Sequence, residues 1–141
     1  MVAEGLVSWE SKRQDTIALS TVEAEYMAFT KATTQALWLS KYFNEIGLPV
    51  TKPLIIHADN SGSISNSVNN KHHRRTKHID VRHHFVKEHT KMGKVTFQHI
   101  PTTKNIADIL TKSLPCDMLR KFVKYLGLNS KMTEVFIQGE C

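Results

Sequence analysis

The chain has 141 residues, 40% hydrophobic and 23% charged, with a formal net charge of +6 at pH 7, which indicates one globular domain with a modest core. No apolar run approaches the roughly 20 residues of a membrane span, and the N-terminus lacks the layout of a secretory signal, so we expect neither a membrane protein nor a secreted one. The two cysteines, Cys116 and Cys141, are far apart and unpatterned, which indicates a reducing compartment without a disulfide framework.

The N-terminal third of the sequence predicts a short strand over residues 5–9 and then a long helix. Ser20 and Glu23 have the spacing of a capping box, in which the Ser20 hydroxyl takes the amide of residue 23 and Glu23 reaches back to the amide of Ser20. The helix is expected to end at the Gly-Leu-Pro sequence of residues 47–49. Five large side chains of this region are predicted to be core residues: Trp9, Tyr26, Met27, Phe29 and Trp38.

Glu25 is the acid in this helix that capping does not explain. At helical spacing it shares a face with Ala28, Ala32, Ala36 and Leu39, and small residues in a row let a helix lie close against a sheet. We therefore expect Glu25 to point along the buried side, where a carboxylate needs a partner. That partner is either a metal ion or a basic side chain.

Residues 54–58 form a short apolar run, Leu-Ile-Ile-His-Ala, between Pro53 and several turn-forming residues. Such a run predicts a strand covered on both faces, as the inner strands of α/β sheets are. Asp59 then lies at the carboxyl end of the strand, where open α/β sheets bind their ligands. Alternatively, Asp59 or Asn60 only caps the short helix predicted for residues 61–67.

Residues 71–94 carry the excess positive charge of the chain. They contain eight Lys or Arg and two acids, which alone accounts for the net charge of +6, together with six of the eight histidines. Clustered positive charge is typical of a nucleic-acid-binding surface, and a solvated helix face with an ordinary basic bias is the alternative. A zinc-binding module is a third interpretation, but no two of these histidines lie four residues apart and no cysteine is near them. Residues 80–92 predict a helix that Gly93 ends.

The C-terminal third predicts one more strand and one more long helix. The strand spans residues 94–100, with Val95 and Phe97 on one face. The helix spans residues 116–126, is amphipathic, and is closed by Gly127.

Asp108 follows a predicted N-cap, Asn105, at the third position of a short helix. An acid in the first turn is favoured by the helix dipole alone, so this position has a structural explanation. With Glu25 and Asp59, however, Asp108 completes a set of three acids in a chain that also has a basic segment. Clustered carboxylates can hold two divalent ions roughly 3.5–4 Å apart, as in two-metal hydrolysis of phosphodiesters, and Mg²⁺ suits such oxygen ligands.

Four stretches of the sequence follow one another in a recognisable order: IALSTVEAEY at residues 17–26, HADN at 57–60, RTKHIDVRHHF at 75–85, and PT at 101–102 with NIADILTK at 105–112. In order and spacing they resemble the ribonuclease H region at the end of copia-type retrotransposon Pol polyproteins. The resemblance extends over residues 5–128, and the run RTKHID is close to diagnostic of the copia branch.

The resemblance implies an α/β ribonuclease H-like fold, with a mixed sheet flanked by helices, and cleavage of the RNA strand of RNA–DNA hybrids with two Mg²⁺ or Mn²⁺ ions. It assigns the catalytic and metal-binding roles to Glu25, Asp59 and Asp108. By extrapolation, five basic side chains grip the backbone of the hybrid: Arg74, Arg75, Lys77, His78 and Arg82. The expected partner besides nucleic acid is the reverse transcriptase part of the polyprotein, in a cytoplasmic virus-like particle or in the nucleus.

The chain departs from this family at its start. Family members begin with two strands, and the first carries the central metal-binding aspartate, whereas the acids upstream of the long helix have no such context here: Glu4, Glu10 and Asp15. We therefore expect a truncated domain over residues 1–128, with a tail over residues 129–141. Because the family sheet order is 3-2-1-4-5, strands 1 and 2 are missing from its middle. Three outcomes are then possible: residues 5–9 pair with residues 54–58, another chain pairs with them, or folding is impaired. Because unpaired strand edges tend to pair with other chains, we expect self-association through the incomplete sheet.

Two functions remain open on these grounds. The first is a ribonuclease H-type endonuclease that is intact only in a longer polypeptide, and that is weak or inactive as this chain alone. The second is a non-catalytic nucleic-acid-binding or assembly remnant of the same family. The missing first carboxylate favours the second function for the chain as given.

Overall fold

The computed structural model describes residues 6–14, 16–68 and 77–128. The chain divides into two compact units. The sheet unit comprises Gln14–Thr103, and the α4 unit comprises Met1–Arg13 with Lys104–Cys141. None of the described helices is long and apolar enough to cross a membrane.

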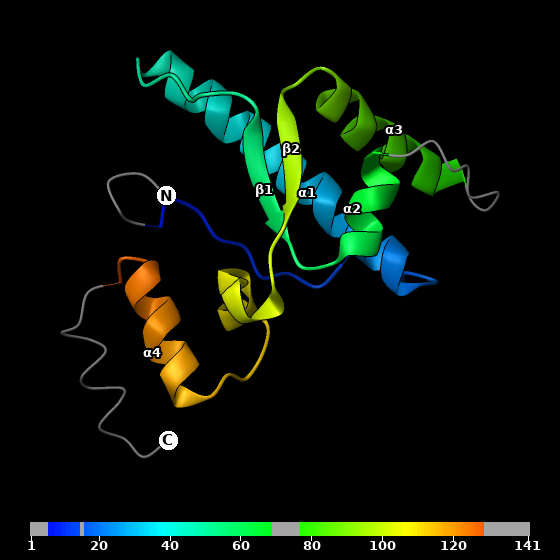
Figure 1. Ribbon diagram of the computed structural model, residues 1–141. Coiled ribbons are helices and arrows are strands. Elements are labelled where there is room, and N and C mark those ends of the chain that lie inside the picture. Colours follow the sequence, from blue (N-terminus) through cyan, green and yellow to red (C-terminus); the bar gives the residue numbers. More distant parts are fainter. Residues whose placement is uncertain (1–5, 15, 69–76, 129–141) are drawn as a thin grey trace. The chain divides into compact units, whose positions relative to one another are not determined.

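The described part of the sheet unit is a parallel pair of strands with helices. The elements follow in the order α1 (Thr21–Glu45), β1 (Leu54–Ala58), α2 (Ser61–Val68), α3 (Lys77–Lys91) and β2 (Val95–His99). Leu54 of β1 lies opposite Val95 of β2, and Ala58 lies opposite His99. Between the two strands the chain passes through α2 and α3, the crossover that a parallel pair requires (Figure 1). The predicted α/β class is confirmed, as are the strands predicted for residues 54–58 and 94–100.

One face of this two-stranded sheet is covered. Residues of β1 and β2 that share this face pack with side chains from all three helices, and the cluster consists of Phe29, Ala58, Val86, Val95 and Phe97 with the partly buried Leu37, Leu54, Ile56, Ile64 and Phe85. Phe29 of α1 stacks on Phe97 of β2, with ring centroids 4.6 Å apart. The predicted alternation of β2 and the predicted burial of Phe29 are therefore confirmed.

The other face of the sheet is open among the described residues. Ile55 is 53% exposed, and His57 and Gln98 are exposed as well. The expectation that residues 54–58 are covered on both faces is wrong here, because α1, α2 and α3 all pack against the same face. An unbroken apolar run gives no information on which of its faces has a neighbour.

Both ends of α1 are fixed by hydrogen bonds that the sequence predicts. The Ser20 hydroxyl accepts from the amide of Glu23 at 3.1 Å, and the Glu23 carboxylate accepts from the amide of Leu19 at 2.7 Å rather than from that of Ser20. At the other end, the amide of Leu48 donates to the carbonyl of Phe43 at 2.8 Å, and that of Gly47 donates to Asn44 at 3.2 Å. This is a Schellman motif, for which Gly47 adopts a positive φ of 79°.

The buried face of α1 differs from the predicted one. Tyr26, Phe29, Thr33 and Ser40 are buried along the helix at helical spacing, whereas Ala28, which was assigned to the buried face with Glu25, is exposed. Large side chains gain more from burial than alanines do, because the stabilisation scales with the apolar area removed from water. The row of Tyr26 and Phe29 therefore faces the core. The predicted core positions of Tyr26 and Met27 are confirmed.

The predicted burial of Trp9 and Trp38 is wrong, and so is the predicted first strand. Trp9 is 66% exposed and Trp38 is 58% exposed, and Trp38 stacks on Tyr42 one turn further along α1 with centroids 5.8 Å apart. Residues 6–9, the described part of the predicted strand 5–9, are not a strand. A strand needs a neighbour for its backbone groups, and the described α4 unit contains none. The amide of Leu6 instead donates to the carbonyl of Leu126 at 3.2 Å.

The described part of the α4 unit contains a short 3₁₀ helix, η2 (Ile106–Leu110), and an α-helix, α4 (Cys116–Tyr125). A 3₁₀ turn, η1 (Thr102–Lys104), precedes them at the boundary between the units. Phe122 and Leu126 are its buried apolar residues, on the amphipathic face that the sequence predicts. Cys116 is disulfide-bonded, contrary to the expectation of a chain without a disulfide framework. The expected tail, residues 129–141, lies outside the described residues.

Candidate functional site

Glu25 lies in the second turn of α1 and is half-buried. It is one residue before Tyr26, whose side chain is buried between α1 and α3. The Tyr26 ring stacks on the imidazole of His83, with centroids 4.3 Å apart and planes 11° from parallel. This contact ties the start of α1 to the helix that begins in the basic segment.

The Tyr26 hydroxyl is buried and has no hydrogen-bond partner among the described residues. Its burial raises the pKa of Tyr26 to about 12, because the charged phenolate would lose its hydration. Tyr26 therefore stays neutral at any physiological pH and serves packing. Sequence reasoning missed the role of His83, because a stacking partner 57 positions away leaves no local signal.

Asp59 follows β1 directly and precedes α2, as the sequence predicts. It is half-buried, and it forms no hydrogen bond or ion pair with the residues that the structure describes. In the first turn of α2, the carbonyl of Asn60 accepts from the amide of Ile64 at 3.2 Å. The Asp59 carboxylate thus has no capping bond in the described part of the chain, and it remains available at the carboxyl end of the strand.

Asp108 lies in the other unit and is 7% exposed. Its carboxylate pairs with the amine of Lys112 at 2.9 Å and accepts a hydrogen bond from the side-chain amide of Asn105 at 3.2 Å. Asn105 is at the N-cap position, as predicted, but its side chain makes no capping bond. Both partners come from the sequence NIADILTK. The i,i+4 spacing of Asp108 and Lys112 was the signal for this ion pair.

The structure therefore places two of the three predicted carboxylates in one unit. Glu25 and Asp59 come from α1 and from the end of β1, and these two elements are in contact. Asp108 belongs to the α4 unit. The described ranges contain no group of three or more His, Cys, Asp or Glu side chains that could hold a metal ion.

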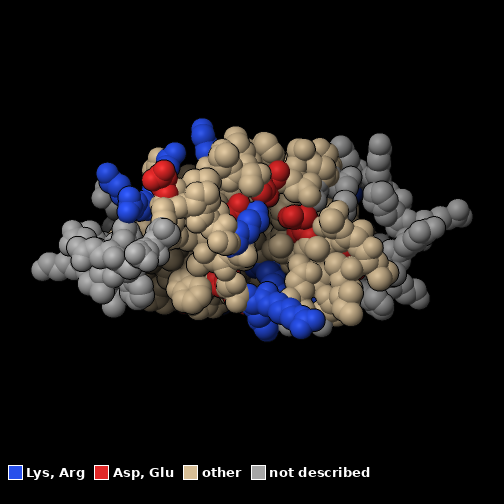
Figure 2. Space-filling view, turned by 90° about the horizontal axis from the view of Figure 1, so that it is seen from below, with Lys and Arg blue, Asp and Glu red and all other residues tan. Residues whose placement is uncertain are grey.

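The basic side chains assigned to nucleic acid are described only in part. Arg82 is half-buried on α3. Arg74 and Arg75 lie outside the described residues, as do the side chains of Lys77 and His78 in the first turn of α3. On the face that Figure 2 presents, the described Lys and Arg side chains form several small groups with acidic side chains among them.

Comparison with known proteins shows what the chain is similar to over most of its length. No protein-family model matches the sequence, and no solved structure matches it. The retrovirus-related Pol polyprotein from transposon TNT 1-94 of Nicotiana tabacum is 38% identical over 126 residues, which are 89% of this chain and 9% of that protein. The retrovirus-related Pol polyprotein from transposon RE1 of Arabidopsis thaliana is 31% identical over 122 residues, or 86% of this chain and 8% of that protein.

A shorter match is to a protein with a different kind of name. Secreted RxLR effector protein 161 of Plasmopara viticola is 58% identical over 36 residues, which are 26% of this chain and 25% of that protein. The matches to the Pol polyproteins cover far more of the chain, although the chain spans less than a tenth of their length. The homologues of this chain over most of its length are therefore retrovirus-related Pol polyproteins from plant transposons.

Proposed function

We propose that these 141 residues are part of the ribonuclease H-like region of a copia-type retrotransposon Pol polyprotein, and that on their own they bind nucleic acid without cutting it. The observation that carries this proposal is the similarity to Pol polyproteins over 86–89% of the chain. It includes all four sequence stretches that resemble the ribonuclease H region. The order of those stretches agrees with the order of the elements: a helix with Glu25, a strand ending at Asp59, a basic helix, and a late turn with Asp108.

The proposal that the chain alone does not cut is supported by the surroundings of its carboxylates. Two-metal hydrolysis needs several oxygen ligands around a pair of ions. Among the described residues no such group is assembled, and the Asp108 carboxylate already has Lys112 and Asn105 as partners. An Asp108 carboxylate that is paired with Lys112 does not fit the pair of Mg²⁺ or Mn²⁺ ions that the resemblance implies, so we derive no hydrolytic step through a metal.

An endonuclease is the second candidate function, and one observation favours it. Asp59 is half-buried at the carboxyl end of β1, without a hydrogen bond or ion pair to the described residues. A carboxylate in that position needs a cationic partner to offset its partial desolvation. A divalent ion shared with Glu25 and with a carboxylate from another part of the polyprotein would supply that partner.

Nucleic-acid binding rests on the charge of residues 71–94. Lys and Arg that neutralise phosphates release counterions, so the affinity falls steeply with salt concentration. We assign the contacts to Arg74, Arg75, Lys77, His78 and Arg82. The stacking of His83 on Tyr26 anchors α3, from which the last of these side chains extends, to the body of the sheet unit.

The experiment is a titration of a fluorescent RNA–DNA hybrid with the 141-residue chain at several salt concentrations, followed by anisotropy. A double variant, Arg74→Gln with Arg75→Gln, is expected to bind about tenfold more weakly and to reduce the salt slope by about two, since each phosphate contact contributes about one. The control is Arg120→Gln, an exposed arginine of α4, which should change neither quantity. An equal loss of affinity in the control and in the double variant would contradict the assignment. It would show that binding depends only on the net charge of the chain.

A further inference from the structure

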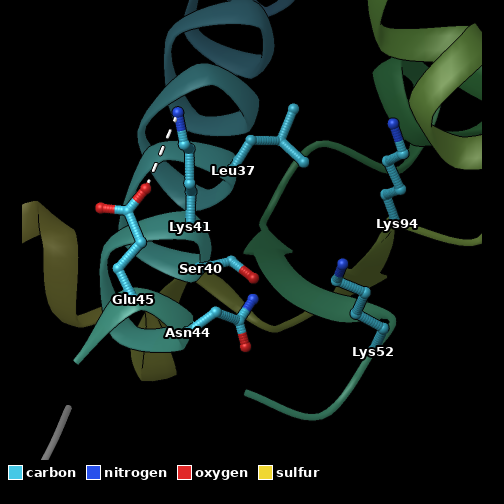
Figure 3. Close-up of a pocket in the computed structure, with 7 residues that line it drawn as sticks. All are labelled: Leu37, Ser40, Lys41, Asn44, Glu45, Lys52 and Lys94. Carbon is cyan, nitrogen blue, oxygen red and sulfur yellow. Dashed lines mark ion pairs between the residues drawn. The ribbon is translucent and has the colours of Figure 1, made fainter. Parts of the chain in front are cut away.

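A cavity of about 400 Å³ lies in the sheet unit at the amino ends of β1 and β2, the opposite end of the strands from Asp59 (Figure 3). Its walls are the last turns of α1, Lys52 just before β1, and Lys94 just before β2. The volume is in the range of sites for small molecules. None of the residues proposed above for metal or nucleic acid lines it.

The cavity is positively charged. It is lined by three lysines and one glutamate. Lys41 and Glu45 form an exposed ion pair at 3.8 Å, and Figure 3 shows these two side chains turned toward each other. The amines of Lys52 and Lys94 form no ion pair with the described residues. They therefore supply uncompensated positive charge at the cavity.

The wall formed by α1 also contains an unpaired hydroxyl. Ser40 is only 4% exposed, and its Oγ atom has no hydrogen-bond partner among the described residues. Two other hydroxyls of α1 bond to the carbonyl one turn earlier, Thr30 to Tyr26 and Thr34 to Thr30, each at 2.9 Å, whereas the buried Thr33 hydroxyl also has no partner among the described residues. Ser40 has no such bond, and in Figure 3 its oxygen points away from the helix, on the same side as the Asn44 amide and toward Lys52. A buried hydroxyl without a partner is costly and calls for an explanation.

The end of α1 does not repel an anion as strongly as a helix C-terminus usually does. The carbonyls of Phe43 and Asn44 accept hydrogen bonds from Leu48 and Gly47 in the Schellman motif. The cavity wall is therefore made by side chains with donor groups, rather than by unpaired carbonyl oxygens. Leu37 is the one apolar residue of the lining.

We propose that this cavity binds the phosphate group of a small phosphorylated molecule. Lys52 and Lys94 supply the charge, and the Ser40 hydroxyl and the Asn44 amide supply hydrogen bonds. Lysine is a common phosphate ligand because its ammonium is a compact charge with several donors. A cavity of about 400 Å³ leaves room for an organic group beside the phosphate. The proposal is independent of the proposed function.

The test is calorimetric titration of the full chain with adenosine 5′-monophosphate, with inorganic phosphate and with adenosine. The monophosphate and inorganic phosphate should bind, and adenosine should not. Lys52→Gln and Lys94→Gln should each weaken the binding of the monophosphate about tenfold. The matched control, Lys91→Gln, removes an exposed charge of α3 that does not line the cavity and should have no effect.

Ser40→Ala separates a binding role from a structural one. It should weaken binding of the monophosphate severalfold and yet raise the melting temperature of the ligand-free chain, because it removes the unpaired hydroxyl. Binding of adenosine as tight as that of the monophosphate would overturn the proposal. So would an equal loss in Lys91→Gln, or unchanged binding in the variants of Lys52, Lys94 and Ser40.

Discussion

The two faces of the β1–β2 sheet differ in their neighbours. On one face Ala58, Val95 and Phe97 are buried under three helices, and on the other Ile55 is 53% exposed. Parallel sheets are normally covered on both faces, because their crossovers place helices there. The described residues thus complete one half of a layered α/β core. The covered face therefore holds the buried apolar packing of this unit, whereas the described residues of the unit leave the other face without a neighbour.

The largest expected effect is on the covered face. Phe97→Ala should lower the free energy of unfolding by about 3–5 kcal/mol, because it removes a ring that stacks on Phe29 and leaves a cavity. The measurement is urea denaturation followed by circular dichroism. Gln98→Ala on the same strand, whose side chain is exposed, should change stability by less than about 0.5 kcal/mol. Similar losses in both variants would contradict the assignment of the two faces.

The helical layer under the covered face predicts a loss of stability at high pH. Burial raises the pKa of Tyr26 to about 12, above the value of about 10 for a tyrosine in the unfolded chain. Because the pKa of Tyr26 is higher in the folded chain than in the unfolded chain, the stabilisation by the neutral Tyr26 side chain is fully present below pH 10. It is lost as the pH rises through 12. The expected loss is about 2–3 kcal/mol.

The comparison for this prediction is Tyr26→Phe, which lacks the ionisable hydroxyl. Urea denaturation of both proteins at pH 8 and at pH 11.5 isolates the contribution of Tyr26, because all other titrating groups are shared. The variant should lose less stability than the parent between these two pH values. Identical pH dependence of the two proteins would show that Tyr26 is accessible to water.

On the open face we expect a change in association instead of stability. The exposed apolar Ile55 on this face predicts self-association, and Ile55→Asp should raise the dissociation constant of the oligomer at least tenfold, about 1.4 kcal/mol. Sedimentation velocity over a range of protein concentrations measures it. Val81→Asp, on α3 and 71% exposed, is the matched control and should leave the association unchanged. A parent chain that stays monomeric at every concentration would exclude this use of the open face.

The smallest effect concerns neither face. Ser20→Ala removes the hydroxyl that caps α1 at 3.1 Å and should cost about 1 kcal/mol. Ser20→Asp keeps an acceptor at the same position and should retain most of the stability. If the alanine variant were as stable as the parent, the capping box would have no energetic role here.

The parts of the fold that follow from neighbouring residues could be predicted from the sequence. The cap at Ser20, the stop at Gly47 and the alternation of Val95 and Phe97 depend on contacts within a turn or within one strand. The exposure of Trp9 and Trp38 could not be predicted in this way, because it depends on what lies opposite them. An apolar side chain is buried only where another element covers it.

The candidate site divides in the same way. Asp59 is at the end of its strand as predicted, because a strand and the turn after it are local features. The pairing of Asp108 with Lys112 is also local, and its spacing could have been recognised. The stacking of His83 on Tyr26 joins two segments that lie far apart in the chain. The cavity beside Lys52 and Lys94 is likewise lined by residues from three separate segments. Only the folded chain brings these groups together.

The most direct test of the central claim is incubation of a labelled RNA–DNA hybrid with the chain in Mg²⁺ and in Mn²⁺, beside Asp59→Asn, in samples shown to be folded. We predict that the hybrid is bound and stays intact, with no cleavage above the level of Asp59→Asn in either metal. Cleavage by the parent chain that Asp59→Asn abolishes would contradict this account. It would establish that these residues assemble a working two-metal site.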